Sequence, residues 1–121
     1  MEEGSIVHVS SIAAEMIRRD LAPYCAAKAG LNALTRCSAK ELAPSIRVNA
    51  IAPGFVITPL SEDTYAAGTP ERAEIDDRTV LGRVAQAEEM VGAAIYLGSD
   101  AASYTTGEVI TVDGGFAKSA F

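Results

Sequence analysis

Short apolar segments alternate along this chain with longer segments of helix-forming residues. Residues Ser5 to Val9 are rich in β-branched residues and almost continuously apolar, which is typical of a strand covered on both faces in a parallel sheet. Two further strands are predicted at Ile46–Ile51 and Glu108–Val112, followed respectively by Ala52-Pro53-Gly54 and Asp113-Gly114-Gly115. Both following segments are turn signals, so we expect each of these strands to end there.

Two helices are predicted between the strands. The first spans Tyr24 to Leu42, is rich in Ala, Leu, Lys and Glu, and lies between Pro23, which a first helical turn tolerates, and Pro44. The second spans Gln86 to Gly98 and has acidic residues near its amino-terminal end. The order strand, helix, strand, helix, strand predicts parallel strands joined by right-handed crossovers, and therefore an α/β fold.

Two expectations concern the surroundings of these elements. The first helix has small residues around much of its circumference, and a helix of this kind is usually packed closely on more than one side. They are Ala26, Ala27, Ala29, Gly30 and Ala33. Residues 60–78 are polar and acidic and are interrupted by Gly68 and Pro70, which predicts short helices in a mobile surface excursion.

Composition narrows the classes of function. The chain has 121 residues, 49% of them hydrophobic and 21% charged, as expected of one packed domain. Its formal net charge of -6 argues against nucleic acid and anionic membrane surfaces as partners, because both are bound by clustered Lys and Arg. The acidic residues between 60 and 78 have no His or Cys partners, so they indicate a solvated surface and no metal site.

The two cysteines indicate a reducing compartment. Cys25 and Cys37 lie 12 residues apart on one predicted helix, about 18 Å along its axis, too far for a disulfide. We expect both to be small buried apolar residues and the protein to be cytoplasmic. The amino terminus has neither a basic start nor a long apolar region, so no signal peptide is expected.

Ser11, Tyr24 and Lys28 form a candidate acid/base site. Tyr24 and Lys28 are four residues apart and therefore share one face of the predicted helix. A cation beside a phenol favours the phenolate, so the pair can exchange a proton with a substrate oxygen while the ammonium stays charged. Ser11, at the end of the first strand, can hydrogen-bond the same oxygen. Spacing alone is weak support, because many helices contain Tyr-x3-Lys by chance.

Four ordered motifs raise this hypothesis to a family resemblance. The chain resembles the short-chain dehydrogenase/reductase family in GSIVHVSS (4–11), YCAAKAG (24–30), RVNAIAPGFVIT (47–58) and TGEVITVDGG (106–115). The motifs span nearly the whole chain but match only the carboxyl-terminal half of a family member. The resemblance therefore implies that residues 1–121 are a single partial domain. It would be the second half of a doubly wound, Rossmann-type parallel-sheet domain, with three strands and flanking helices.

The resemblance also implies a role for each site residue. Tyr24 would be the general acid/base. Lys28 would stabilise its phenolate and hold the ribose hydroxyls of an NAD or NADP cofactor, while Ser11 would position the substrate. Pro53, Gly54, Val56 and Thr58 resemble the segment that contacts the nicotinamide. A proline-glycine turn at the end of a strand suits this role, because it lets the backbone approach a flat ligand.

Several family features have no counterpart in these 121 residues. They are the glycine-rich phosphate-binding turn, the residue that recognises the adenine ribose, and a further catalytic asparagine. His8 occupies a strand position where relatives often carry asparagine, and a structural role is the better interpretation. The implied activity is reversible hydride transfer on an alcohol or carbonyl substrate, either 3-oxoacyl reductase-like or sugar/polyol dehydrogenase-like, and we expect this chain to be inactive alone.

The alternative hypothesis is a non-catalytic remnant or an oligomerising fragment. The Ser5–Val9 strand would normally pair with a preceding strand, and a bare edge is a template for association. Related enzymes also form subunit contacts through long helices. Self-association into a dimer or tetramer is therefore expected under either hypothesis.

Overall fold

The computed structural model describes residues 3–118 and contains a three-stranded parallel sheet. Its strands are β1 (Gly4–Val9), β2 (Ile46–Pro53) and β5 (Val109–Val112), in the order β1-β2-β5. The register aligns Val9 with Ile51 and Ile51 with Ile110. Both the predicted strands and their parallel direction are confirmed. β2 continues through Ala52 and Pro53, which were predicted to be turn residues.

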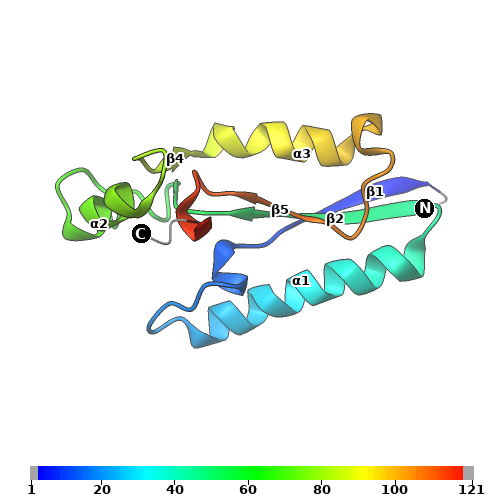
Figure 1. The fold of residues 1–121 in the computed structure, drawn as a ribbon, viewed down its shortest axis with the longest axis horizontal. Helices are drawn as coiled ribbons and strands as arrows, with labels where there is room; N and C mark the ends of the chain where they lie inside the picture. Colours follow the sequence, from blue (N-terminus) through cyan, green and yellow to red (C-terminus); the bar gives the residue numbers. More distant parts are fainter. Residues whose placement is uncertain (1–2, 119–121) are drawn as a thin grey trace.

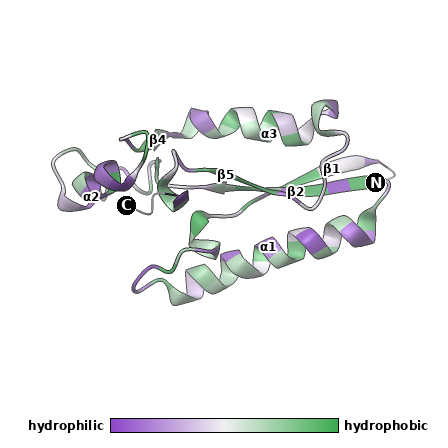
Figure 2. Ribbon diagram, viewed as in Figure 1, coloured by the Kyte–Doolittle hydropathy of each residue, from purple (hydrophilic) through white to green (hydrophobic). Residues whose placement is uncertain are grey.

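Two helices cover opposite faces of this sheet (Figure 1). Helix α1 (Ala22–Leu42) packs against β2 from one side, and α3 (Val91–Gly98) packs against β1 and β2 from the other. Figure 2 shows hydrophobic residues along the strands and a mixture of hydrophobic and hydrophilic residues along α1. The central strand is the best covered, and Val48 and Ala50 within it are completely buried.

The core lies between β2 and α3. Ile51, Leu97 and Ala102 form a buried cluster, and Val7 and Ile110 pack against it from the neighbouring strands. The predicted second helix is shorter than expected. Its first residues form a two-residue strand, β4 (Ala85–Gln86), and a 3-10 helix, η2 (Ala87–Met90).

Helix α1 begins and ends where its prolines predict, but its packing differs from the expectation. Pro23 lies in its first turn, and Ala43, before Pro44, has extended backbone. Within the described residues α1 packs by one side only, and its few buried residues share that side. They are Asn32, Thr35 and Ala39. The prediction of close packing on more than one side is therefore wrong for the single chain.

The cysteine prediction is half wrong for the same reason. Cys25 is partly buried, but Cys37 is exposed on the uncovered side of α1. Both thiols are free, as predicted from their separation along the helix.

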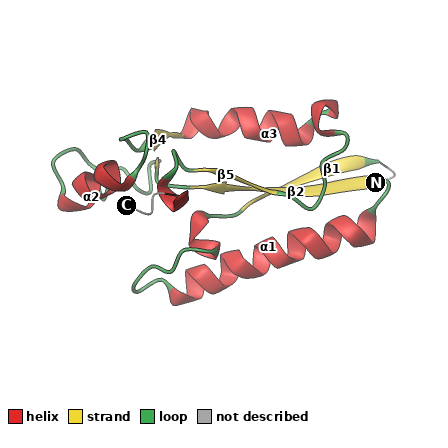
Figure 3. Cartoon of the chain, viewed as in Figure 1, coloured by secondary structure: helices red, strands yellow, loops and turns green. Residues whose placement is uncertain are grey.

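The excursion between β2 and α3 contains one α-helix, α2 (Pro70–Arg78), the 3-10 helix η2 and a small second sheet. Thr69 caps α2 by accepting a hydrogen bond from the Arg72 amide, and Pro70 occupies the first turn. Strand β3 (Val56–Ile57) pairs in parallel with β4. Figure 3 shows this region beyond the end of the main sheet, where the strands give way to loops and short helices.

Two polar residues of the third motif organise the approach to β5. Asn49 is completely buried; its side-chain amide donates to the Thr105 carbonyl and its oxygen accepts from the Glu108 amide. The Arg47 guanidinium donates to the carbonyls of Leu97 and Ser99, where α3 ends. These bonds tie β2 to the end of α3 and to the segment before β5, so both residues have structural roles.

Glu89 and Arg83 form an ion pair that stabilises the start of η2. The Arg83 guanidinium contacts both Glu89 carboxylate oxygens, at 2.6 and 2.8 Å, and the Gln86 amide donates to one of them. The hydrogen bond from Arg83, with the one from the Gln86 backbone, lowers the pKa of Glu89 to about 2. The carboxylate is therefore strongly preferred in the folded protein.

This shift predicts a pH dependence of stability. A carboxyl group whose pKa is lowered on folding stabilises the protein above its unfolded pKa, and this contribution disappears as the pH falls toward its folded pKa. We expect the free energy of unfolding to decrease between about pH 5 and pH 2, and Glu89→Gln to make that decrease shallower. Urea titrations across this range measure it. Glu88→Gln, a neighbour outside any ion pair of the described structure, should leave the slope unchanged; equal slopes in all three proteins would contradict the assignment.

Candidate active site

The carboxyl end of β1 positions the first candidate residue. Ser11 follows Ser10 directly after the strand, and its hydroxyl oxygen accepts a hydrogen bond from the Ala13 amide at 3.1 Å. This contact caps a 3-10 helix, η1 (Ile12–Ala14), which packs against α1. The capping bond uses an acceptor lone pair of the hydroxyl and leaves its proton free to donate to a ligand.

Tyr24 and Lys28 lie in the first two turns of α1. The Lys28 ammonium nitrogen lies 5.7 Å from the centroid of the Tyr24 ring. It also donates to the carbonyl of Val9, the last residue of β1, at 3.0 Å. The Tyr24 side chain is 45% exposed. Helical spacing therefore places the two side chains together, and the ammonium ties them to the end of the neighbouring strand.

The Pro53–Thr58 segment is held against the turn that follows β5. A Cβ atom on Gly54 would lie 2.7 Å from Asp113 Cβ and 2.9 Å from Asp113 Cα, so only glycine fits this close approach. Asp113 in turn accepts hydrogen bonds from the amides of Gly115 and Ala117. The Asp113-Gly114-Gly115 turn is confirmed, and Gly114 and Gly115 both have positive φ.

Ser61 organises the two residues of this segment that the sequence assigns to a cofactor. Its hydroxyl donates to the Val56 carbonyl at 2.7 Å and accepts from the Thr58 amide at 2.9 Å. The Thr58 and Ser61 hydroxyl oxygens are 3.2 Å apart. Ser61 was not identified from the sequence. One indication of this role was present in the sequence: a hydroxyl three residues after Thr58 is close enough along the chain to bond the backbone of a local turn.

The candidate residues share one end of the molecule. Figure 1 shows the carboxyl ends of the three strands and the start of α1 at the same end, together with α2 and β4. In open parallel sheets ligands bind outside the carboxyl ends of the strands, so this arrangement is that of a ligand site. Lys28 joins the helix to β1 through a hydrogen bond, and η1, which Ser11 caps, packs against α1, the helix that carries Tyr24.

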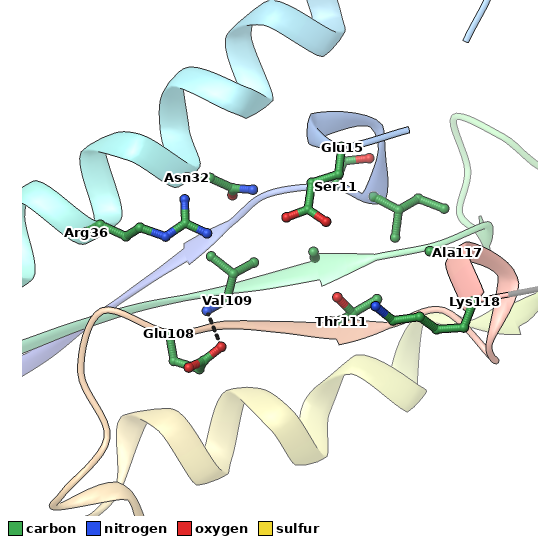
Figure 4. Close-up of a pocket in the computed structure, with 11 residues that line it drawn as sticks. Ser11, Glu15, Asn32, Arg36, Glu108, Val109, Thr111, Ala117 and Lys118 are labelled. Atoms are coloured by element: carbon green, nitrogen blue, oxygen red, sulfur yellow. Dashed lines mark hydrogen bonds between the residues drawn. The ribbon is translucent and has the colours of Figure 1, made fainter. Parts of the chain in front are cut away.

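A cavity of about 230 Å³ opens beside Ser11, on the side of the sheet that faces α1. Figure 4 shows Ser11 and Glu15 on one side of it and Asn32 and Arg36 projecting from α1. Glu108, Thr111 and Lys118 also line it, but Tyr24 and Lys28 do not. Of the three candidate acid/base residues, only Ser11 therefore lines this cavity.

Other residues singled out from the sequence have structural contacts. The His8 ring nitrogen Nδ1 lies 2.9 Å from the Thr35 hydroxyl of α1, which fits the predicted structural role. The Arg18 guanidinium lies over the Phe55 ring, 5.2 Å from its centroid. Between residues 3 and 118 no group of His, Cys, Asp and Glu is arranged to hold a metal ion. No helix in that range is long and apolar enough to cross a membrane.

Comparisons with known proteins identify the family. The family model described as enoyl-(acyl carrier protein) reductase matches residues 1–117. Cis-4-hydroxycyclohexanecarboxylate dehydrogenase from Sinomonas cyclohexanicum is 46% identical over 116 residues, which are 93% of this chain and 45% of that protein. The 3-oxoacyl-[acyl-carrier-protein] reductase from Thermotoga maritima is 44% identical over 115 residues, 93% of this chain and 45% of that protein.

Solved structures agree with the fold. A NAD(P)-dependent gluconate 5-dehydrogenase described from Beutenbergia cavernae, with bound NADP, superposes with a TM-score of 0.92 at 42% identity. The match covers 98% of this chain and 47% of that one. This chain thus spans about half the length of the relatives it matches. The sequence match over residues 1–117 and the shared fold establish that the chain belongs to the short-chain dehydrogenase/reductase family.

Proposed function

We propose that this chain carries the proton-transfer residues of an NAD(P)-dependent oxidoreductase that interconverts an alcohol and a carbonyl compound. The observation that carries the proposal is the Lys28 ammonium, which lies over the Tyr24 ring while bound to the end of β1. Family members are NAD(P)-dependent oxidoreductases, which supports the same reaction class.

Each residue has a chemical role in this proposal. Tyr24 gives its hydroxyl proton to the carbonyl oxygen during reduction and accepts it back during oxidation. Lys28 remains charged and stabilises the phenolate left on Tyr24. The Ser11 hydroxyl, whose proton is not used in capping η1, donates to the same substrate oxygen and fixes its position.

The residues present fit part of a nicotinamide cofactor, which supplies the hydride when bound. An ammonium has three donor protons, and Lys28 uses one of them on Val9, so two remain for ribose hydroxyls. The Val56 carbonyl accepts from Ser61 but keeps a second lone pair for a carboxamide. We propose Tyr24, Lys28, Pro53, Gly54, Val56 and Thr58 as the residues that contact it, without a choice between NAD and NADP.

Relatives suggest two substrate classes. The names of the similar proteins include a 3-oxoacyl-[acyl-carrier-protein] reductase and an L-xylulose reductase from Caenorhabditis elegans, 41% identical over 117 residues. We propose either a 3-oxoacyl thioester or a sugar or polyol as the substrate, handled in the cytoplasm. Neither nucleic acid nor a membrane is part of the proposal.

A second candidate function is self-association without catalysis. Within the described structure β1 pairs only with β2, which leaves its other edge unpaired. Leu34 on the uncovered side of α1 is 53% exposed, and Val9 at the end of β1 is 61% exposed. An unpaired edge beside exposed apolar side chains favours association with another chain. A dimer or tetramer is compatible with either function.

A chimera tests the proposed function. In this chimera, residues 1–117 replace the matching part of the Beutenbergia cavernae protein, whose solved structure contains bound NADP. The design relies on the remaining part of that protein for the rest of the cofactor site. Oxidation of NADH and NADPH is followed with a 3-oxoacyl thioester and with a keto sugar. Turnover with either class supports the proposal. A folded chimera that binds the cofactor and turns over neither class supports the non-catalytic alternative.

A further inference from the structure

Two buried polar residues lie beside the proton-transfer residues, and the reaction described above does not use them. Ser10 is 3% exposed and Asn32 is 4% exposed. The Ser10 hydroxyl donates to the Asn32 side-chain oxygen at 2.6 Å, and it lies 3.5 Å from the Lys28 carbonyl oxygen. This bond joins the residue before Ser11 to the helix that carries Tyr24 and Lys28.

The sequence positions of the pair give the bond its geometry. Tyr24, Lys28 and Asn32 follow one another at intervals of four, so they form a single row along α1. Lys28 binds the carbonyl of Val9 and Asn32 binds the hydroxyl of Ser10, so consecutive turns of the helix contact consecutive residues of the strand end. Figure 4 shows Asn32 projecting from α1 toward the sheet, on the side where Ser11 leaves β1.

The strand end is held from its other side as well. The Ser10 amide donates to the Ile51 carbonyl of β2 at 2.7 Å. Ser10 is therefore held both by the central strand and by α1, and these two bonds restrain its neighbours Val9 and Ser11. A buried hydrogen bond is directional, so it fixes the orientation of the two groups that it joins. A contact between two apolar side chains at the same place would not fix their orientation in this way.

We propose that Asn32, acting through Ser10, is a positioning residue that fixes the Lys28 ammonium and the Ser11 hydroxyl relative to each other. The Ser10–Asn32 bond is observed in the described structure. The inference rests on the proposed function only for the roles of the Lys28 ammonium and the Ser11 hydroxyl. Neither Ser10 nor Asn32 touches the reacting atoms in this account, so neither is a catalytic residue.

The chain offers a matched control. Thr35 lies one turn beyond Asn32, is also completely buried, and is also within hydrogen-bond distance of a residue of β1, His8. The Thr35–His8 contact joins the same helix to the same strand but lies farther from the strand end that carries Ser11. Asn32→Leu and Thr35→Val thus each remove one helix-to-strand contact, and only the first removes it beside Lys28.

The first measurement needs no activity. NMR of the 121-residue chain reports the Lys28 side-chain signals and the exchange rate of its ammonium protons. We expect Asn32→Leu to shift these signals and raise the exchange rate, because the Val9 contact loosens. Thr35→Val should leave them unchanged, and Asn32→Gln, which keeps an uncharged amide acceptor for Ser10, should restore them in part. Unchanged Lys28 signals in Asn32→Leu, or equal changes in Thr35→Val, would overturn the proposal.

The second measurement uses the chimera. We expect Asn32→Leu to lower kcat roughly 10- to 100-fold with KM nearly unchanged, the size of effect that a small misplacement of reacting groups produces. Thr35→Val should retain kcat. A wild-type chimera that is inactive would argue against the proposed function while leaving the NMR test of the Asn32 role intact. An active chimera in which Asn32→Leu keeps its kcat would overturn the positioning role.

Discussion

Tyr24→Phe in the chimera is expected to lower kcat by about 10²- to 10⁴-fold, the usual contribution of a positioned general acid/base. The substitution removes one hydroxyl and keeps the ring, so the cation–π contact of the Lys28 ammonium with the ring is preserved. Cofactor binding should weaken much less, because Lys28 keeps its contact with Val9 and its free donor protons. Steady-state kinetics with NADH and NADPH measure kcat and KM separately.

The matched control for this change is another tyrosine. Tyr104 is fully exposed and lies between α3 and the amino end of β5, away from the carboxyl ends of the strands, and Tyr104→Phe removes the same hydroxyl. It should leave kcat within twofold, roughly the scatter of surface substitutions. If Tyr24→Phe retained the wild-type kcat, Tyr24 would not be the proton donor.

Gly54→Ala is expected to destabilise the protein by about 1–3 kcal/mol, the usual cost of overpacking. The added methyl group would lie 2.9 Å from the Asp113 Cα atom, so the backbone of one segment has to move. That movement separates the Pro53–Thr58 segment from the Asp113-Gly114-Gly115 turn. We therefore expect cofactor binding in the chimera to weaken together with stability.

Gly92→Ala is the control for that substitution. Nothing lies within 4 Å of a Cβ atom built on Gly92, which is in the first turn of α3. In a helix this change is neutral or stabilises by up to about 1 kcal/mol. Urea titrations of all three proteins measure the difference. If Gly54→Ala were as stable as Gly92→Ala, the contact with Asp113 would not constrain the backbone.

The sequence predicted the strands and the helix that carries Tyr24 and Lys28 well because their signals are local. The apolar run before Ser10 forms β1, and Pro23 and Pro44 bracket α1 as expected. Helical spacing alone predicted that Tyr24 and Lys28 lie together. Segments governed by distant contacts were less predictable: Ala52 and Pro53 extend β2 because they pair with Thr111 and Val112 of β5.

The contacts that hold the site together were harder to predict. Ser10 and Asn32 are 22 residues apart, and each alone is an ordinary polar residue. They are buried because α1 packs against the sheet, and the sequence pattern does not show which residues of the helix meet the strand end. Cys37 shows the opposite error, since its apolar character suggested burial but it lies on the side of α1 that none of residues 3–118 covers. Sequence pattern predicts which face of a helix is apolar more readily than which face is covered.

Calorimetric titration of NADH and NADPH into the 121-residue chain and into the chimera tests the central claim most directly. The claim is that these residues provide proton transfer and the nicotinamide contacts, while a glycine-rich phosphate-binding turn, which residues 1–121 do not contain, must come from elsewhere. We predict micromolar binding to the chimera and no saturable binding to the chain at millimolar cofactor. Micromolar binding by the chain alone would contradict the account, because the cofactor would then be held without that turn.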